Sequence, residues 1–222
     1  MPDGYAPNIR YPVNTTGHLR TRMQELENHG PVDIVFLGSS HAYRGFDPRI
    51  WSKRGYTTYN LGSSAQTFLQ TELIVNAHVP ALKPKVAIIE THPGPFTDAS
   101  VESAVDVITN RRIDLHTCRM AIRLPDVLVW NAMAYGFVRQ FSGYDARFEE
   151  KRAHGKDIYV DGGFVMRTEG TFVPKGGQPR ETAVPLPDQW AAFERVLGAL
   201  RAQGIEVILV EAPMTRWYYE GG

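Results

Sequence analysis

The stretch VDIVFLGSSHAYRGFDP (residues 32–48) decides the fold class, because it joins a strand, a tight loop and a helix start. Residues 32–37 form a largely β-branched apolar run, which is typical of strands buried on both faces of a parallel sheet. The Asp-Pro pair at 47–48 is typical of an N-cap and first helical position, and Gly55 predicts the end of a short helix. YTTYNLG (residues 56–62) then predicts a second strand.

The same alternation continues along the chain. Residues 67–79 have helical apolar spacing that is expected to stop at Pro80, and KVAIIE (residues 85–90) predicts a third strand. Residues 187–203 predict an amphipathic helix, and IEVILVEAP (residues 205–213) predicts a fourth buried strand. Because strands alternate with helices, the sequence predicts an α/β fold with a parallel sheet between helical layers.

Residues 97–187 interrupt this alternation, and we expect them to be an insertion or lid within a single α/β domain spanning residues 1–222. Residues 97–142 have a helical pattern with a break at 124–125. Residues 157–173 resemble a small hairpin around an Asp-Gly-Gly turn. The sequence ends about nine residues after the fourth strand, where a doubly wound domain normally adds a helix, so we expect the domain to be incomplete at its C-terminal end.

Composition excludes several classes of function. The 222 residues carry 24 Lys+Arg and 24 Asp+Glu, so the basic surface that binds nucleic acid is not indicated. Cys118 is the single cysteine and cannot form an internal disulfide, and no zinc-ligand spacing, metal or organic cofactor is implied. No apolar run approaches the ~18 residues of a membrane span, and residues 1–16 do not resemble a secretory signal. A soluble globular chain of open oligomeric state is expected.

Polar clusters follow each of the first three predicted strands, at residues 38–41, 60–66 and 91–92. In an open α/β sheet, ligands bind outside the carboxyl ends of the strands. A Gly-Ser-Ser turn can expose a serine Oγ while backbone N–H groups point at the same volume, as oxyanion stabilisation requires. The alternatives are ordinary loop chemistry and, ranked last, phosphate binding at a helix N-terminus, for which the usual glycine motifs are absent.

VFLGSSHAYRGFDP (residues 35–48) and YNLGSSAQT (residues 59–67) resemble the first two blocks of the SGNH (GDSL-like) hydrolases. They are most similar to the Gly-Ser-Ser branch, which includes the D-alanine-transfer protein of teichoic acid modification and alginate O-acetylation proteins. The resemblance is sharp over residues 32–70 and weaker at the third and fourth predicted strands. Together these segments make up about a quarter of the chain. It implies a three-layer α/β/α fold of the flavodoxin-like kind.

The resemblance also implies roles for individual residues. Ser40 matches the nucleophile of the first block. Ala65 falls on the oxyanion-hole glycine of the second block, and an alanine keeps the donating N–H. Gly62, Asn60 and His41 are further candidates for oxyanion or substrate contacts.

Two parts of the family pattern are missing. The third block normally offers an asparagine, but residues 91–94 read Thr-His-Pro-Gly. The C-terminal Asp-x-x-His, which supplies the family's base and its carboxylate, is absent. His92 is therefore the main candidate to assist Ser40. The remaining histidines are expected at the surface or at helix ends (His18, His29, His78, His116 and His154).

The resemblance implies a serine esterase or O-acyltransferase that acts on acylated polysaccharide or another envelope ester through an acyl-Ser40 intermediate. The alternative is a non-catalytic SGNH-like module that binds a glycan or a partner protein. Proteins of this branch work mostly outside the cytoplasm, so a cell-envelope location is implied, although the chain shows no signal or anchor.

Two further patterns have structural interpretations. Trp130, Tyr135, Phe137 and Phe141 form an aromatic stripe that favours core or lid packing over a carbohydrate platform. The pair at 111–112, Arg-Arg, is expected to be a solvated helix end.

Overall fold

The computed structural model of this protein describes residues 17–143, 149–170 and 184–213. The helices among them are α1 (Leu19–Glu27), α2 (Ser40–Gly45), α3 (Pro48–Ser52), α4 (Phe68–Leu82), α5 (Gly94–Thr97), α6 (Val101–Asn110), α7 (Leu115–Ile122), α8 (Val127–Ser142) and α9 (Pro187–Ala202). The strands are β1 (Ile34–Leu37), β2 (Thr58–Asn60), β3 (Val86–Glu90), β4 (Ala153–His154), β5 (Asp157–Val160), β6 (Phe164–Arg167) and β7 (Glu206–Val210).

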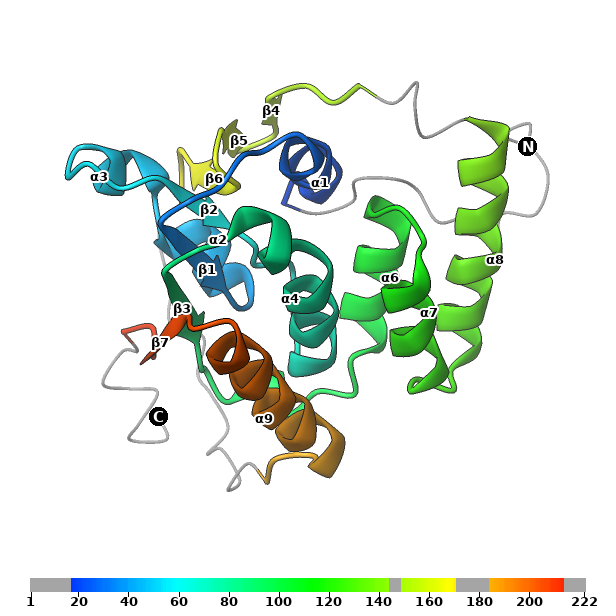
Figure 1. Cartoon of the computed structure of the whole chain (residues 1–222). Helices are drawn as coiled ribbons and strands as arrows, with labels where there is room; N and C mark the ends of the chain where they lie inside the picture. Colours follow the sequence, from blue (N-terminus) through cyan, green and yellow to red (C-terminus); the bar gives the residue numbers. More distant parts are fainter. Residues whose placement is uncertain (1–16, 144–148, 171–183, 214–222) are drawn as a thin grey trace.

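The predicted parallel α/β fold is confirmed. Four parallel strands form one sheet in the order β2-β1-β3-β7, and the arrangement is consistent with a three-layer α/β/α fold (Figure 1). Val35 of β1 pairs with Tyr59 on one side and with Ala87 on the other. Strand β2 lies on one side of β1, and the next strand in the chain, β3, lies on the other side of β1. The direction in which strands are added to the sheet therefore changes between β1 and β3. Such a switch point is where ligands bind in open α/β sheets.

The two faces of the sheet bury different amounts of apolar surface. Alternate residues such as Val35, Leu37 and Ile89 belong to the large core that includes α1, α4 and α9. The other face buries Ile34, Phe36 and Ile88 against a smaller cluster with Phe46 and Trp51. Since fully burying one such side chain contributes roughly 1.5–3 kcal/mol, the larger core provides most of the stability.

Helix α4 corrects one expected boundary. Thr67 and Gln70 form a capping box at its start, but the helix continues through Pro80 to Leu82 instead of stopping before the proline. Proline removes the N–H that would bond to the carbonyl four residues earlier, which is Asn76. Asn76 is exposed, so water can solvate that carbonyl, while Val79 and Leu82 are buried and keep the last turn in place.

Strand β7 was expected to be buried, and that expectation is wrong. It is an edge strand that pairs only with β3 among the described residues, and Ile208 and Leu209 are 41% and 50% exposed. A continuous apolar run indicates a strand in a parallel sheet, but it does not say whether a neighbour covers that strand.

Residues 97–187 lie between β3 and β7 in the chain, and their described parts form helices and a hairpin. The break near 124–125 and the turn at 161–163 occur as expected. The hairpin docks on β2, since the Asn60 N–H donates to the Gly162 carbonyl at 2.8 Å. Gly163 has φ 80°, and a Cβ there would lie 2.3 Å from the Asn60 carbonyl oxygen, so only glycine fits this contact.

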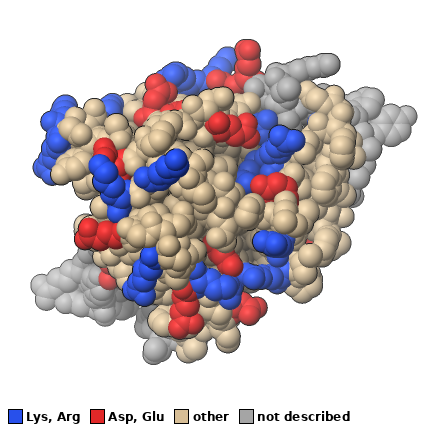
Figure 2. All heavy atoms as spheres, viewed as in Figure 1, with Lys and Arg blue, Asp and Glu red and all other residues tan. Residues whose placement is uncertain are grey.

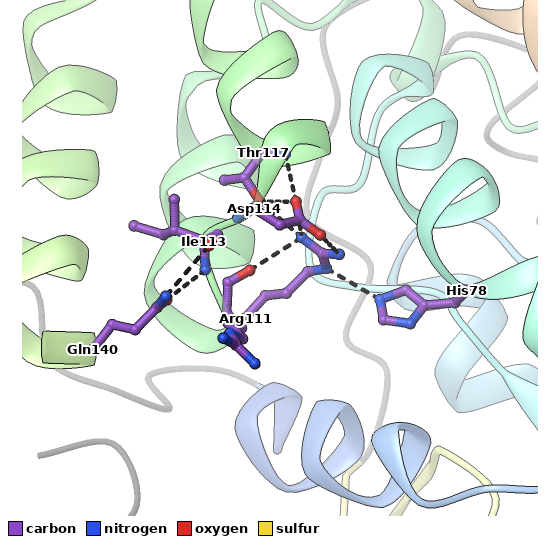
Figure 3. Close-up of polar contacts among 7 residues, drawn as sticks. His78, Arg111, Ile113, Asp114, Thr117 and Gln140 are labelled. Atoms are coloured by element: carbon purple, nitrogen blue, oxygen red, sulfur yellow. Dashed lines mark hydrogen bonds and ion pairs between the residues drawn. The ribbon is translucent and has the colours of Figure 1, made fainter. Parts of the chain in front are cut away.

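Arg111 corrects the expectation of a solvated helix end. Its side chain is only 6% exposed, and its guanidinium joins three segments (Figure 3). It donates to both carboxylate oxygens of Asp114 at 2.9 and 2.6 Å, to Thr117 Oγ1 at 2.7 Å, and to His78 Nε2 at 3.1 Å. Arg112 beside it is exposed, as expected.

His78 is half-buried near the C-terminal end of α4. Burial, and then the neighbouring Arg111 charge, lower the pKa of His78 to about 4, so it is neutral at pH 7 and accepts the Arg111 hydrogen bond. His18 is fully buried at the N-cap of α1, one of the helix-end positions expected for it. The polar groups of this helical region therefore hold helices together.

The aromatic stripe on α8 is not core. Trp130, Phe137 and Phe141 are 46%, 38% and 84% exposed. The rim formed by α8 is mostly free of charge in Figure 2, whereas Lys/Arg and Asp/Glu are interspersed over the rest of the visible face. No helix among the described residues combines the length and apolar character needed to cross a membrane.

Candidate functional site

A cavity of about 230 Å³ opens where the loops after β1, β2 and β3 meet. It brings together four of the residues singled out in the sequence: Ser40, His41, Ala65 and His92. The rest of its described lining consists of Ser39, Gly94, Pro95 and Asp98. Within the segment expected to act as a lid, only Asp98 lines this cavity among the described residues.

The loop after β1 places Ser40 at the first position of α2. Gly38 has φ 141°, and a Cβ there would lie 2.7 Å from the Glu90 Cβ, so glycine lets the two strand ends approach. Ser39 is the N-cap, and its Oγ accepts from the His41 N–H at 3.3 Å. Ser40 is half-buried, and neither its Oγ nor its N–H hydrogen-bonds to any described residue.

Ala65, from the loop after β2, also lines the cavity. It has φ 47°, a left-handed conformation that costs a non-glycine residue roughly 1–2 kcal/mol. The turn is held by the Ser63 hydroxyl, which donates to Gln66 Oε1 at 2.8 Å. The Ala65 N–H donates to no described residue. The cavity is therefore lined by residues whose N–H groups, those of Ser40 and Ala65, have no partner in the part of the chain that the structure describes.

Glu90, at the end of β3, is a candidate site residue that the sequence did not predict. It is 1% exposed and accepts from the Ser39 hydroxyl at 2.9 Å and from the His92 N–H at 2.9 Å. Its Oε1 lies 3.4 Å from His41 Nδ1. A carboxylate at the end of the apolar run VAIIE was the available signal, because a buried charge needs partners.

Electrostatics couple Glu90 to His41. Burial by itself would raise the pKa of Glu90, but hydrogen bonds from His41, from Ser39 and from the His92 N–H hold that pKa below its usual value. The hydrogen bond to Glu90 raises the pKa of His41 above its usual value. With its Nδ1–H directed at the carboxylate, neutral His41 keeps a lone pair on Nε2.

The second imidazole of the cavity, His92, packs against the first. The rings of His41 and His92 are edge-to-face, with centroids 4.8 Å apart. The Gly94 N–H donates to His92 Nδ1 at 3.0 Å, so neutral His92 carries its proton on Nε2. His41, rather than the expected His92, thus has the carboxylate partner and the free nitrogen of a general base.

Asn60 and Gly62 lie behind the cavity and do not line it. The Asn60 amide donates to the Ala42 carbonyl at 2.8 Å and accepts from the Gly62 N–H at 3.1 Å. A Cβ at Gly62 would lie 2.8 Å from the Gly38 carbonyl oxygen. The buried Arg22 donates to the carbonyls of both Asn60 and Gly62. These residues position the loop after β2 against α2.

Ligand atoms of His41, Glu90 and His92 all lie within 4.8 Å of one another. Nitrogen and carboxylate oxygen ligands of this kind are those that a divalent transition metal uses.

No protein-family model matches this sequence, and no curated protein sequence matches it either. The chemistry of the cavity therefore has to be inferred from its own residues.

Proposed function

We propose that this protein is an SGNH-like serine esterase or O-acyltransferase, with Ser40 as the nucleophile. The proposal rests mainly on the cavity, where Ser40 and two N–H groups without a partner among the described residues lie beside the solvent-accessible His41 and its buried carboxylate partner, Glu90. The resemblance of residues 32–70 to the SGNH blocks supports it, since Ser40 and Ala65 occupy the nucleophile and oxyanion positions.

In this mechanism Ser40 Oγ attacks the acyl carbonyl and His41 Nε2 receives the serine proton. Consecutive helical residues do not face each other, so the proton passes through one water held in the cavity. Glu90 stabilises the imidazolium that forms, the role that an aspartate has in serine hydrolases. Proton return to the leaving alcohol gives an acyl-enzyme, which water or a sugar hydroxyl resolves.

The N–H groups of Ser40 and Ala65 stabilise the oxyanion of the tetrahedral intermediate. A preorganised donor of this kind contributes roughly 2.7–4 kcal/mol to the transition state. The family's asparagine donor has no counterpart here, because His92 and Gly94 occupy that wall. The substrate class is an acylated polysaccharide or another envelope ester, by the same resemblance.

A second function, non-catalytic binding of a glycan or partner protein, is favoured by one observation. Ser40 Oγ makes no hydrogen bond to an imidazole among the described residues. In that case the cavity would bind an acyl or sugar group without turning it over.

A fluorophosphonate probe and an aryl acetate substrate test the proposal. Labelling is expected at Ser40 and is lost in Ser40→Ala, whereas Ser52→Ala, an exposed serine on α3, labels like the wild type. His41→Gln should lose more turnover than His92→Gln. Labelling that persists in Ser40→Ala would exclude the nucleophile. Glycan binding without labelling or turnover would select the binding function.

A further inference from the structure

The imidazoles and the carboxylate of the cavity form a group that the serine mechanism does not fully use. His41 and His92 flank Glu90, and their ligand atoms lie within 4.8 Å of one another. His41 belongs to the first turn of α2, which follows β1, whereas Glu90 ends β3 and His92 follows it, so the group lies at the switch point of the sheet. Among the residues that the structure describes, it is the one group of three or more His, Cys, Asp or Glu side chains with this spacing.

Their geometry is close to that of a transition-metal site. A tetrahedral zinc ion with bonds of about 2.0–2.1 Å separates neighbouring ligand atoms by roughly 3.3 Å. The 3.4 Å between His41 Nδ1 and Glu90 Oε1 already fits this distance. The lone pair on His92 Nδ1 accepts the Gly94 N–H, so an ion that binds this nitrogen replaces that hydrogen bond.

The backbone around Glu90 supplies the outer support that a metal site requires. The Ser39 hydroxyl and N–H both donate to Glu90 Oε2, at 2.9 and 3.3 Å, which fixes the carboxylate while Oε1 faces the imidazoles. Such partners orient ligands and commonly change metal affinity by 10–100-fold. Glu90 is buried, whereas the two histidines reach the open cavity, so an ion can enter from solvent.

We propose that His41, Glu90 and His92 bind one divalent transition-metal ion of the zinc type, and that this ion and the serine chemistry exclude each other. The inference rests on the proposed function for its second half. The ion takes the place of the proton that His41 Nδ1 directs at Glu90 Oε1, and this proton is released to solvent. With the ion bound, Glu90 no longer supports His41 as a base for Ser40.

The ligand types select the ion. Two imidazoles and one carboxylate with an open position suit Zn²⁺ or Co²⁺. Mg²⁺ prefers oxygen ligands and retains its water, so it should not compete.

Cobalt binding tests the site without relying on activity. We expect chelator-treated protein to bind one Co²⁺ per chain with the visible absorption of a tetrahedral ion. His92→Gln and Glu90→Gln should each weaken binding by at least about tenfold. His154→Gln, an exposed histidine on β4, is the matched control and should bind like the wild type. Absence of binding, or equal binding by both ligand variants and the wild type, would overturn the site.

Fluorophosphonate labelling of Ser40 separates this inference from the proposed function. Zn²⁺ should slow labelling of the wild type by at least about tenfold, EDTA should restore it, and Mg²⁺ should have no effect. Unchanged labelling of a Co²⁺-binding protein would overturn the mutual exclusion. If metal-free protein does not label but still binds Co²⁺, the serine proposal fails and the metal site stands.

Discussion

The cavity at the end of the sheet and the helical junction around Arg111 are both rich in polar side chains, but they differ in how completely those groups are paired. At the junction, Arg111 donates to Asp114, Thr117 and His78, and the aspartate accepts twice from the guanidinium (Figure 3). In the cavity, the Ser40 N–H and Oγ have no described partner.

We infer from this difference that the Arg111 groups are structural, whereas the cavity groups can bind a ligand. Buried polar groups in folded proteins are nearly always hydrogen-bonded, and the Arg111 network follows that rule because its purpose is to join α4, α6 and α7. A half-buried serine that leaves donors unused beside a buried carboxylate keeps them available for a ligand. Four substitutions test this contrast, and the one with the strongest predicted effect comes first.

Glu90→Gln should have the largest effect. We expect kcat/KM for an aryl ester to fall by about 10²–10⁴, because a neutral amide cannot stabilise the His41 imidazolium. The measurement is steady-state turnover, corrected for the folded fraction by circular dichroism. The glutamine NH2 group would also face the N–H of Ser39 or of His92, which now donates to the carboxylate. Because two donors cannot pair, a lower melting temperature is expected. Wild-type turnover in the variant would remove Glu90 from the mechanism.

Arg111→Ala should destabilise the fold by about 3 kcal/mol, since it leaves His78, Asp114 and Thr117 without their shared donor. Urea unfolding measures this loss. Arg112→Ala is the control: its side chain is exposed, and its effect should stay within about 0.5 kcal/mol. Equal effects of the two variants would contradict the structural role given to Arg111.

His78 should make stability depend on pH. Its folded pKa of about 4 lies below the ordinary value of 6.5, so the unfolded chain takes up the proton first as the pH falls. Relative to pH 6.5 and above, the folded state is destabilised progressively as the pH falls from 6.5 to 4, by about 3 kcal/mol in total.

His78→Gln keeps an acceptor for Arg111 and removes this titration. Burial raises the pKa of Asp106 to about 7, which gives the opposite slope, but wild type and variant share it. The difference between their unfolding free energies should therefore change with pH in this window. A constant difference would mean that His78 is not buried in its neutral form.

Ala65→Gly should have the smallest effect. Glycine removes the left-handed strain of φ 47° but gains freedom in the unfolded chain, so stability should change by less than about 1 kcal/mol. Turnover should stay within about twofold, because the N–H that donates to the oxyanion is retained. A large loss of turnover with intact folding would assign the Ala65 methyl group a direct role.

Local patterns were enough to predict most of the fold. The strands β1 to β3, the helix cap at Asp47 and the hairpin turn at 161–163 depend on nearest-neighbour chemistry, namely β-branched runs, N-caps and glycines. Pro80 was misjudged because burial of Val79 and Leu82 outweighs a local break. The exposure of β7 was missed because a strand's neighbours are not encoded in its own residues.

The sequence was enough to predict a parallel α/β fold and three polar clusters, at residues 38–41, 60–66 and 91–92, that meet because the carboxyl ends of parallel strands lie at one edge. The resemblance to the SGNH blocks then singled out Ser40 and Ala65 within these clusters. Which of these groups pair with one another depends on the three-dimensional arrangement of the strands. Glu90 lies 49 residues after His41 in the chain, yet its carboxylate reaches that imidazole because β1 and β3 are neighbours in the sheet. Likewise, Arg111 is buried because two helices and a turn converge on it, a long-range property that no local pattern contains.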